Sequence, residues 1–119
     1  MPGISGDPTI LLQITSDGMG RGDDALRRKL IVTYLTLLDQ NDMLPGAVAF
    51  FTDGVKLVTD GSPVLEVLRS IESKGVPLIL CKTCLDHYGI ADRVRVGTVG
   101  GMTDIIAAQW KARKVVNIS

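Results

Sequence analysis

Residues 9–18 read TILLQITSDG, a nearly unbroken apolar run that stops at the turn-forming residues Ser16, Asp17 and Gly18. A run of this kind is typical of a strand that is buried on both faces, as strands of parallel sheets are. Further short apolar runs follow along the chain, at residues 47–51, 76–80, 94–96 and 115–118. The sequence therefore predicts five strands, and it predicts that the short apolar piece at residues 55–58 packs in a loop.

Apolar residues at helical spacing separate the predicted strands. From Leu26 to Leu38 they recur every three or four residues, directly after the carboxylates of Asp23 and Asp24, which can cap a helix. Three further helices are predicted: one with Ser62 as its cap and Pro63 in its first turn, a short one that ends at Tyr88, and one over residues 102–110. Strands that alternate with helices in this way indicate an α/β protein, with a parallel sheet that helices cover on both faces.

Size and charge narrow the class of protein. The chain has 119 residues, the usual size of one domain, so residues 1–119 are predicted to form a single domain. Its 13 basic residues balance its 13 acidic ones, which disfavours nucleic-acid binding. The opening residues 1–8 lack a basic region followed by a long apolar run, and no later run approaches membrane-spanning length. We therefore expect neither secretion nor membrane insertion, and a reducing cytoplasm as the compartment.

The most informative segment is Cys81-Lys82-Thr83-Cys84, which directly follows the predicted strand at residues 76–80. Cys84 lies about one helical turn beyond Cys81, so the two sulfurs can approach each other. A thiolate is the reactive form of cysteine, and a helix start with a neighbouring ammonium, here Lys82, favours it. Two cysteines are too few for a disulfide framework, so the pair predicts a reactive site.

Several interpretations of the pair remain open. Cys81 can simply fill the core at a strand end. Thioredoxin-type exchange is a second interpretation, although its motif usually follows an earlier strand and opens a longer helix. Zinc binding by Cys81, Cys84 and His87 is a third, although the chain has no other cysteine or histidine to complete four ligands. Sulfur relay, in which a thiolate takes sulfur from a donor persulfide, is the fourth. The sequence predicts no bound metal and no cofactor.

Other loops are expected beside the cysteines, because ligands of open parallel sheets gather at the carboxyl ends of the strands. The candidate pocket residues are Asp17, Gly18, Met19, Gly20, Asp53, Gly54, Gly100 and Met102. The glycines after the first strand invite comparison with phosphate-binding loops, but neither Gly-x-Gly-x-x-Gly nor a Lys-Ser/Thr ending is present. Nucleotide binding is therefore not the leading prediction.

Five segments, at residues 17–20, 52–55, 61–65, 81–86 and 96–97, read DGMG, TDGV, GSPVL, CKTCLD and VG. Together they resemble DsrE-like proteins, and within that superfamily the DsrE-like domain of YedF-type selenium-metabolism proteins. The resemblance implies a three-layer α/β/α sandwich, flavodoxin-like in appearance, with a five-stranded, mainly parallel sheet. It also implies frequent homo-oligomerisation. Lys82 stands where a glycine is expected between the cysteines, which weakens the transfer of a selenium-specific role.

The resemblance implies a sulfur-relay or sulfurtransferase-like activity. By motif position, Cys81 would carry sulfane sulfur as a persulfide, Cys84 would resolve it, and Lys82 and Thr83 would support the thiolate. The expected partners are sulfur donor and acceptor proteins. The alternative is a non-catalytic binding or assembly module, in which the cysteines are structural and the loops at the strand ends bind a small ligand or another subunit.

Overall fold

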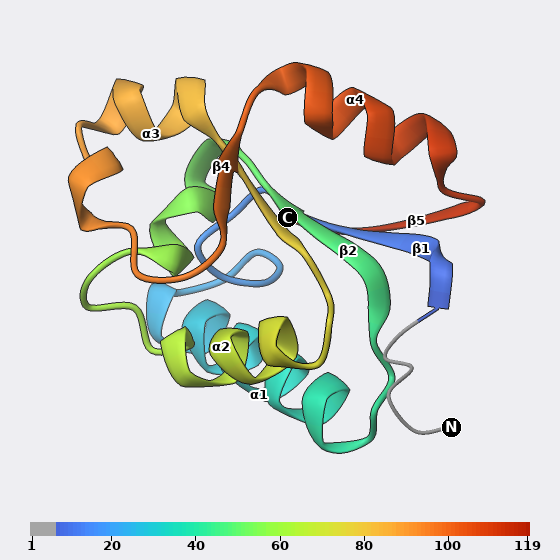
Figure 1. Cartoon of the computed structure of the whole chain (residues 1–119). Helices are drawn as coiled ribbons and strands as arrows, with labels where there is room; N and C mark the ends of the chain where they lie inside the picture. Colours follow the sequence, from blue (N-terminus) through green and yellow to red (C-terminus); the bar gives the residue numbers. More distant parts are fainter. Residues whose placement is uncertain (1–6) are drawn as a thin grey trace.

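A five-stranded parallel sheet forms the centre of the computed structural model, which describes residues 7–119 (Figure 1). The strands are β1 (Asp7–Ile14), β2 (Pro45–Phe50), β3 (Leu78–Cys81), β4 (Thr98–Gly100) and β5 (Lys114–Ile118), in the order β4-β3-β2-β1-β5. Every neighbouring pair is parallel. The α/β fold with a five-stranded parallel sheet, predicted from the sequence, is confirmed. Most of the opening segment discussed above, residues 1–6, lies outside the described residues.

Helices lie on both sides of the sheet. The helices are α1 (Asp24–Gln40), α2 (Leu65–Ser73), α3 (Lys82–Tyr88) and α4 (Met102–Lys111), with 3-10 helices η1 (Thr52–Val58) and η2 (Ala91–Arg93). Figure 1 shows α1 and α2 below the sheet and α3 and α4 above it. None of the helices within residues 7–119 is both long and apolar enough to cross a lipid bilayer.

The core forms where the sequence places its apolar runs. Val48, Ala49 and Phe50 of the central strand β2 are all buried, because side chains on both faces of this strand meet helices or neighbouring strands. The first helix is also as predicted: the Asp23 side chain accepts a hydrogen bond from the Leu26 N–H at 2.9 Å.

The fourth strand is not where the sequence predicts it. Residues 94–96 were expected to form it, but Val94 makes only an isolated antiparallel bridge with Thr59 and Val96 is buried in a loop. The chain then turns at Gly97, with a φ of 89°, and β4 follows. β4 is a short edge strand with exposed Thr98 and Val99, so it has no apolar run that could have revealed it.

Two smaller predictions also need correction. Helix α2 begins at Leu65 with Val64 as its cap, so Ser62 and Pro63 precede the helix. The Ser62 hydroxyl instead accepts a hydrogen bond from the Val64 N–H at 3.2 Å, within the turn before the helix. Residues 55–58, expected in a loop, belong to the 3-10 helix η1, in which Val55, Leu57 and Val58 are buried.

Candidate functional site at the carboxyl edge of the sheet

The two cysteines lie at the junction of β3 and α3 but differ in exposure. Cys81 is the last residue of β3 and the N-cap of α3; its side chain is 0% exposed, and it lies opposite Gly100 of β4 in the sheet register. Cys84 lies in the first turn of α3 and is half-buried. Both are free thiols. Cys84 therefore keeps part of its surface exposed at this edge of the sheet, whereas Cys81 lies within the core.

A backbone group from the neighbouring loop contacts the more exposed sulfur. The Thr52 N–H donates a hydrogen bond to Cys84 Sγ, with a nitrogen–sulfur distance of 3.1 Å. Thr52 follows β2, which is hydrogen-bonded to β3, so the sheet brings two segments 32 residues apart together at its carboxyl edge. An N–H donor aimed at a sulfur stabilises a thiolate more than a thiol.

Thr52 has an unusual backbone conformation. Its φ is 54°, in the left-handed region that β-branched residues rarely adopt. The turn is held from both sides: the Phe51 N–H donates to the Ile14 carbonyl at 3.2 Å, and the Gly54 N–H donates to the Phe51 carbonyl at 3.1 Å. A Cβ atom on Gly54 would lie 1.9 Å from the Ile14 oxygen, so only glycine allows this close contact.

The surroundings of Cys84 act on its acidity in opposite directions. Burial raises the pKa of the Cys84 thiol, and a hydrogen-bonding interaction with the Cys81 thiol raises it further. The Thr52 N–H lowers it, because that donor favours the negatively charged sulfur. The net pKa of Cys84 lies above the ordinary value, so the resting residue is a thiol. The Thr52 N–H is already in position to stabilise the thiolate when it forms.

A second polar contact joins α3 to η1 beside the sulfur. The Tyr88 hydroxyl donates a hydrogen bond to the Asp53 carboxylate. The Lys56 ammonium lies 3.3 Å from the same carboxylate and 4.5 Å from the centre of the Tyr88 ring. The Tyr88 hydroxyl, and secondarily Lys56, hold the pKa of Asp53 below its usual value. The hydrogen bond to Asp53 in turn raises the pKa of Tyr88, so its hydroxyl remains a donor.

Lys82 and Thr83, predicted to support a thiolate, are both exposed. The Lys82 ammonium is 2.6 Å from a carboxylate oxygen of Asp86, one turn along α3. The Lys82 ammonium, which the sequence predicted to favour a cysteine thiolate, is thus paired with the Asp86 carboxylate at the surface. The group found in contact with a sulfur is the Thr52 N–H, and the role of Lys82 and Thr83 stays a prediction.

The loop at residues 17–20 folds back on α1 rather than opening as a phosphate cradle. The Asp17 carboxylate is 3.2 Å from the Arg27 guanidinium. The Met19 N–H donates to the Arg27 carbonyl at 3.0 Å, and the Gly20 N–H donates to the Ser119 carbonyl at 2.9 Å. These N–H groups are therefore already engaged. Gly18 is buried against Arg27, because a Cβ atom there would lie 2.8 Å from the Arg27 Cβ.

The structure brings some of the predicted pocket residues close to the cysteines and leaves others apart. Asp53 and Gly54 belong to the η1 turn, and Gly100 lies opposite Cys81. Met102, at the start of α4, is 47% exposed. Within residues 7–119, no group of three histidine, cysteine or acidic side chains is arranged to hold a metal ion.

Lys56 and Tyr88 are site residues that the sequence did not single out, and Thr52 lies in the segment 52–55 of the family resemblance but had no role predicted for it. Thr52 contacts Cys84 through its backbone N–H, and Tyr88 contacts Asp53, 35 residues earlier in the sequence, through its hydroxyl. No motif predicts the Tyr88 contact, and the segment 52–55 does not by itself predict that its first N–H contacts a sulfur. The nearest signal was the position of Thr52 directly after a predicted strand, at the edge where ligands of parallel sheets gather.

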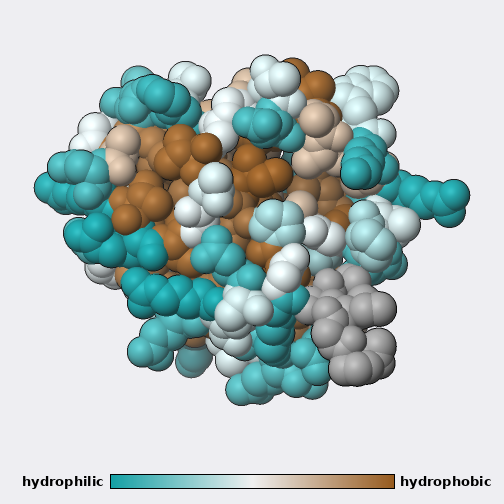
Figure 2. Space-filling view, viewed as in Figure 1, coloured by the Kyte–Doolittle hydropathy of each residue, from teal (hydrophilic) through white to brown (hydrophobic). Residues whose placement is uncertain are grey.

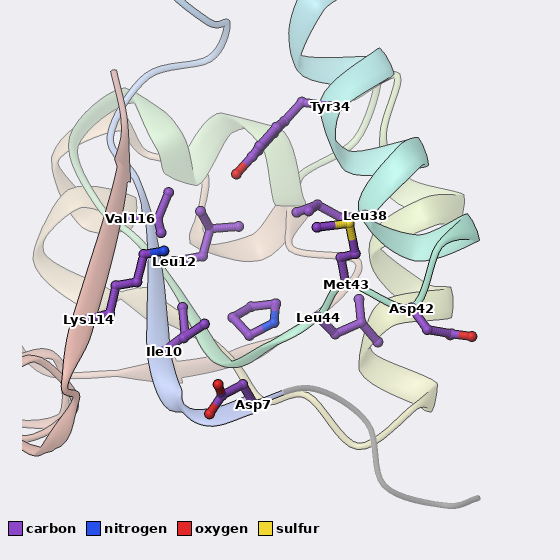
Figure 3. Close-up of a pocket in the computed structure, with 11 residues that line it drawn as sticks. Asp7, Ile10, Leu12, Tyr34, Leu38, Asp42, Met43, Leu44, Lys114 and Val116 are labelled. Atoms are coloured by element: carbon purple, nitrogen blue, oxygen red, sulfur yellow. The ribbon is translucent and has the colours of Figure 1, made fainter. Parts of the chain in front are cut away.

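A cavity lies near the other end of the sheet, toward the amino ends of β1, β2 and β5 (Figure 3). It has a volume of about 630 Å³ and is lined mainly by apolar side chains from β1, β5, α1 and the loop after it, among them Ile10, Leu12, Tyr34, Leu38 and Val116. The sequence predicted a small-ligand site at the carboxyl ends of the strands instead. The surface also carries apolar residues: Figure 2 shows them gathered in the middle of the face that β4 crosses. Val99 of β4 is 45% exposed.

Comparison with known proteins places the chain in a family. The sequence profile of the DsrE/DsrF-like family matches residues 10–118. The chain belongs to the DsrE/DsrF-like family. No curated protein sequence matches it. The family resemblance inferred from the motifs is thus confirmed, while the closer likeness to YedF-type proteins stays a prediction.

Solved structures of low sequence identity share the fold of this DsrE/DsrF-like chain. The YchN protein from E. coli has a TM-score of 0.65 at 20% identity, over 97% of this chain and 100% of YchN. MTH1491 from Methanobacterium thermoautotrophicum has a TM-score of 0.64 at 18% identity, over 91% and 96%. BT1422 from Bacteroides thetaiotaomicron has a TM-score of 0.65 at 15% identity, over 92% and 95%. The latter two are described as proteins of unknown function.

Proposed function

We propose that this DsrE/DsrF-like protein is a sulfur carrier, which holds sulfane sulfur as a cysteine persulfide on the Cys81–Cys84 dithiol and passes it from a donor protein to an acceptor. The observation that supports the proposal most is the hydrogen bond from the Thr52 N–H to Cys84 Sγ. A cysteine that serves only as core packing needs no polar donor at its sulfur, whereas a thiolate does.

The chemistry requires only groups of the protein and the donor. A cysteine thiolate attacks the outer sulfur of a donor persulfide, R–S–SH. A new sulfur–sulfur bond forms on the protein, the bond between the two donor sulfurs breaks, and its electron pair leaves with the donor as R–S⁻. The protein then carries Cys–S–SH, and the same exchange with an acceptor thiolate releases the sulfur again. No external oxidant is needed.

Several properties of this carrier stay predictions. The resemblance assigns the persulfide to Cys81 and resolution to Cys84. It also implies homo-oligomers, with sulfur donor and acceptor proteins as partners. The composition and the two cysteines predict a reducing cytoplasmic environment, in which both thiols are free. The unequal burial of the two cysteines bears on which of them acts first.

Intact-protein mass spectrometry with glutathione persulfide tests the carrier function. The wild type should gain a mass of one sulfur atom that a reducing agent removes, and a Cys81→Ala/Cys84→Ala double variant should gain none. If the wild type and the two single variants, Cys81→Ala and Cys84→Ala, all gain no sulfur although iodoacetamide labels their thiols, the protein is not a carrier. The non-catalytic binding module would then be the better interpretation.

A further inference from the structure

We propose that Cys84, rather than Cys81, accepts the sulfur, and that the Thr52 N–H stabilises the Cys84 thiolate during the transfer. This inference rests on the proposed sulfur-carrier function and assigns its chemistry to one sulfur and one backbone donor. It reverses the order that motif position implies for the two cysteines.

Burial is the first argument. A sulfur transfer requires the attacking thiolate to contact the outer sulfur of the donor directly. Cys81 is 0% exposed and sits between β2 and β4 at the end of β3, so no donor sulfur reaches it without movement of the strand or of α3. Cys84 lies three residues further, on the partly exposed first turn of α3. An incoming donor therefore meets Cys84 first.

The placement of Thr52 is the second argument. Its N–H is aimed at Cys84 Sγ by a turn that the rest of the fold holds in an unfavourable left-handed conformation. The Phe51 N–H and the close contact of Gly54 both fix this turn to the Ile14 carbonyl at the end of β1. The Thr52 N–H is thus in position before negative charge develops on the sulfur. Such an arrangement stabilises the charge without reorganisation of the protein.

The same N–H acts in both directions of transfer. When Cys84 attacks, its sulfur is a thiolate, and the Thr52 N–H lowers the free-energy cost of forming that thiolate. When an acceptor thiolate later attacks the outer sulfur of Cys84–S–SH, Sγ leaves with the bonding electron pair and is again a thiolate. A better-stabilised leaving thiolate departs faster.

Asp53, Lys56 and Tyr88 hold the two parts of this site together. Tyr88 lies one turn after Cys84 along α3 and donates its hydroxyl to Asp53, the residue after Thr52. Lys56 neutralises the same carboxylate, so the contact brings no net negative charge toward the sulfur. We assign these residues a positioning role: they keep the first turn of α3 against the Thr52 turn.

Cys81 then becomes the resolving residue. As a thiolate, it attacks Sγ of Cys84–S–SH and forms a Cys81–Cys84 disulfide, while the outer sulfur leaves as hydrosulfide, HS⁻. The persulfide sulfur is reduced and the two cysteine sulfurs are oxidised, so the exchange balances without another oxidant. The burial of Cys81 keeps this reaction internal.

Persulfide mapping on single variants tests the assignment. After incubation with glutathione persulfide, Cys81→Ala should load sulfur on Cys84 and hold it more stably than the wild type. Cys84→Ala and Cys84→Ser should carry at most one-tenth of the sulfur that Cys81→Ala carries. Circular dichroism checks that each variant is folded. Loading of Cys84→Ala equal to that of Cys81→Ala would overturn the inference but leave the carrier function intact. Absence of loading on every variant and on the wild type would instead remove the carrier function itself.

An NMR titration tests the role of the Thr52 N–H. In ¹⁵N-labelled Cys81→Ala protein, the Thr52 amide should shift with pH along the same curve as iodoacetamide labelling of Cys84. Other ionisable groups lie near this contact: Tyr88 and His87 of α3, Asp53 and Lys56 of η1, and the Asp17–Arg27 pair beyond Asp53. The Cys81→Ala/Cys84→Ser variant, which keeps all of them, is therefore the control. A Thr52 amide that moves equally in the control, or in neither protein, would refute the donor role.

Discussion

Within residues 7–119, two turns place a non-glycine residue in left-handed backbone, and the two differ in what holds them there. Asp42, with a φ of 51°, follows the end of α1, and its carboxylate lies 3.2 Å from the Lys74 ammonium. Aspartate is among the residues that tolerate this conformation, because its short polar side chain finds local partners. Thr52, with a φ of 54°, is β-branched and has no such tolerance.

The comparison shows which of the two turns has a strained backbone because of contacts with distant parts of the fold. The turn at Asp42 ends a helix and is explained by residues beside it in the sequence. The turn at Thr52 is imposed by tertiary contacts, through Gly54 against the Ile14 carbonyl, and its N–H points at a cysteine sulfur. Backbone strain that the surroundings enforce is a feature of functional sites.

The largest effect should come from breaking the contact that enforces the Thr52 turn. Gly54→Ala inserts a methyl group 1.9 Å from the Ile14 oxygen and should lower the free energy of unfolding by about 3 kcal/mol. Gly101→Ala is the matched control, because a Cβ atom at this position would lie 3.9 Å from its nearest neighbour, the Thr103 nitrogen. We expect the free energy of unfolding to fall by less than about 1 kcal/mol there. Urea denaturation measures both. Equal losses would mean that Gly54 does not clamp the turn.

Relief of the strain itself should have a smaller effect, of opposite sign. Thr52→Gly removes the unfavourable side chain from a left-handed position and should raise the free energy of unfolding by about 1 kcal/mol. Asp42→Gly should give no gain, because aspartate is only weakly strained there and the contact with Lys74 is lost. Denaturation of the two variants side by side decides the comparison. A gain at position 42 and none at position 52 would reverse our interpretation.

Removal of the second sulfur should change the acidity of the first. In Cys81→Ala, the Cys84 pKa should fall, because the interaction with Cys81 that raises it is gone while the Thr52 N–H remains. The thiolate fraction at neutral pH then increases, and alkylation by iodoacetamide becomes faster there. The pH dependence of the alkylation rate gives the pKa. An unchanged or higher value would show that the two thiols do not interact.

The smallest effect concerns the contact between α3 and η1. Tyr88→Phe removes the main hydrogen bond that lowers the Asp53 pKa, so this pKa should rise toward its ordinary value. A lowered carboxyl pKa contributes stability above the unfolded-state pKa, and this is lost as the pH falls through the folded-state pKa. The cost of Tyr88→Phe should therefore be greatest near neutral pH and shrink in acid.

Carbon NMR of the Asp53 carboxyl measures this change directly. Tyr34→Phe is the control, since burial alone raises the Tyr34 pKa and no contact with Asp53 is involved. If both phenylalanine variants leave the Asp53 pKa unchanged, the hydroxyl contact is not what lowers it.

Local pattern was sufficient for most of the fold. The apolar runs at residues 9–15 and 47–51 became strands because strands buried on both faces must be apolar throughout. The Asp23 cap and the spacing after it placed α1 correctly. The fourth strand was misplaced because β4 is an exposed edge whose register with β3, rather than its composition, makes it a strand.

The candidate site divides in the same way. The sequence by itself determined the cysteine pair, its place at the end of the third strand and the family to which the chain belongs. Only the tertiary structure decided that Cys81 is buried while Cys84 is partly exposed, and that the Thr52 N–H contacts the Cys84 sulfur. The physical reason is that burial and hydrogen bonding across β2, β3 and η1 depend on segments about 30 residues apart. Their contacts exist only once the sheet has brought the carboxyl ends of its strands together.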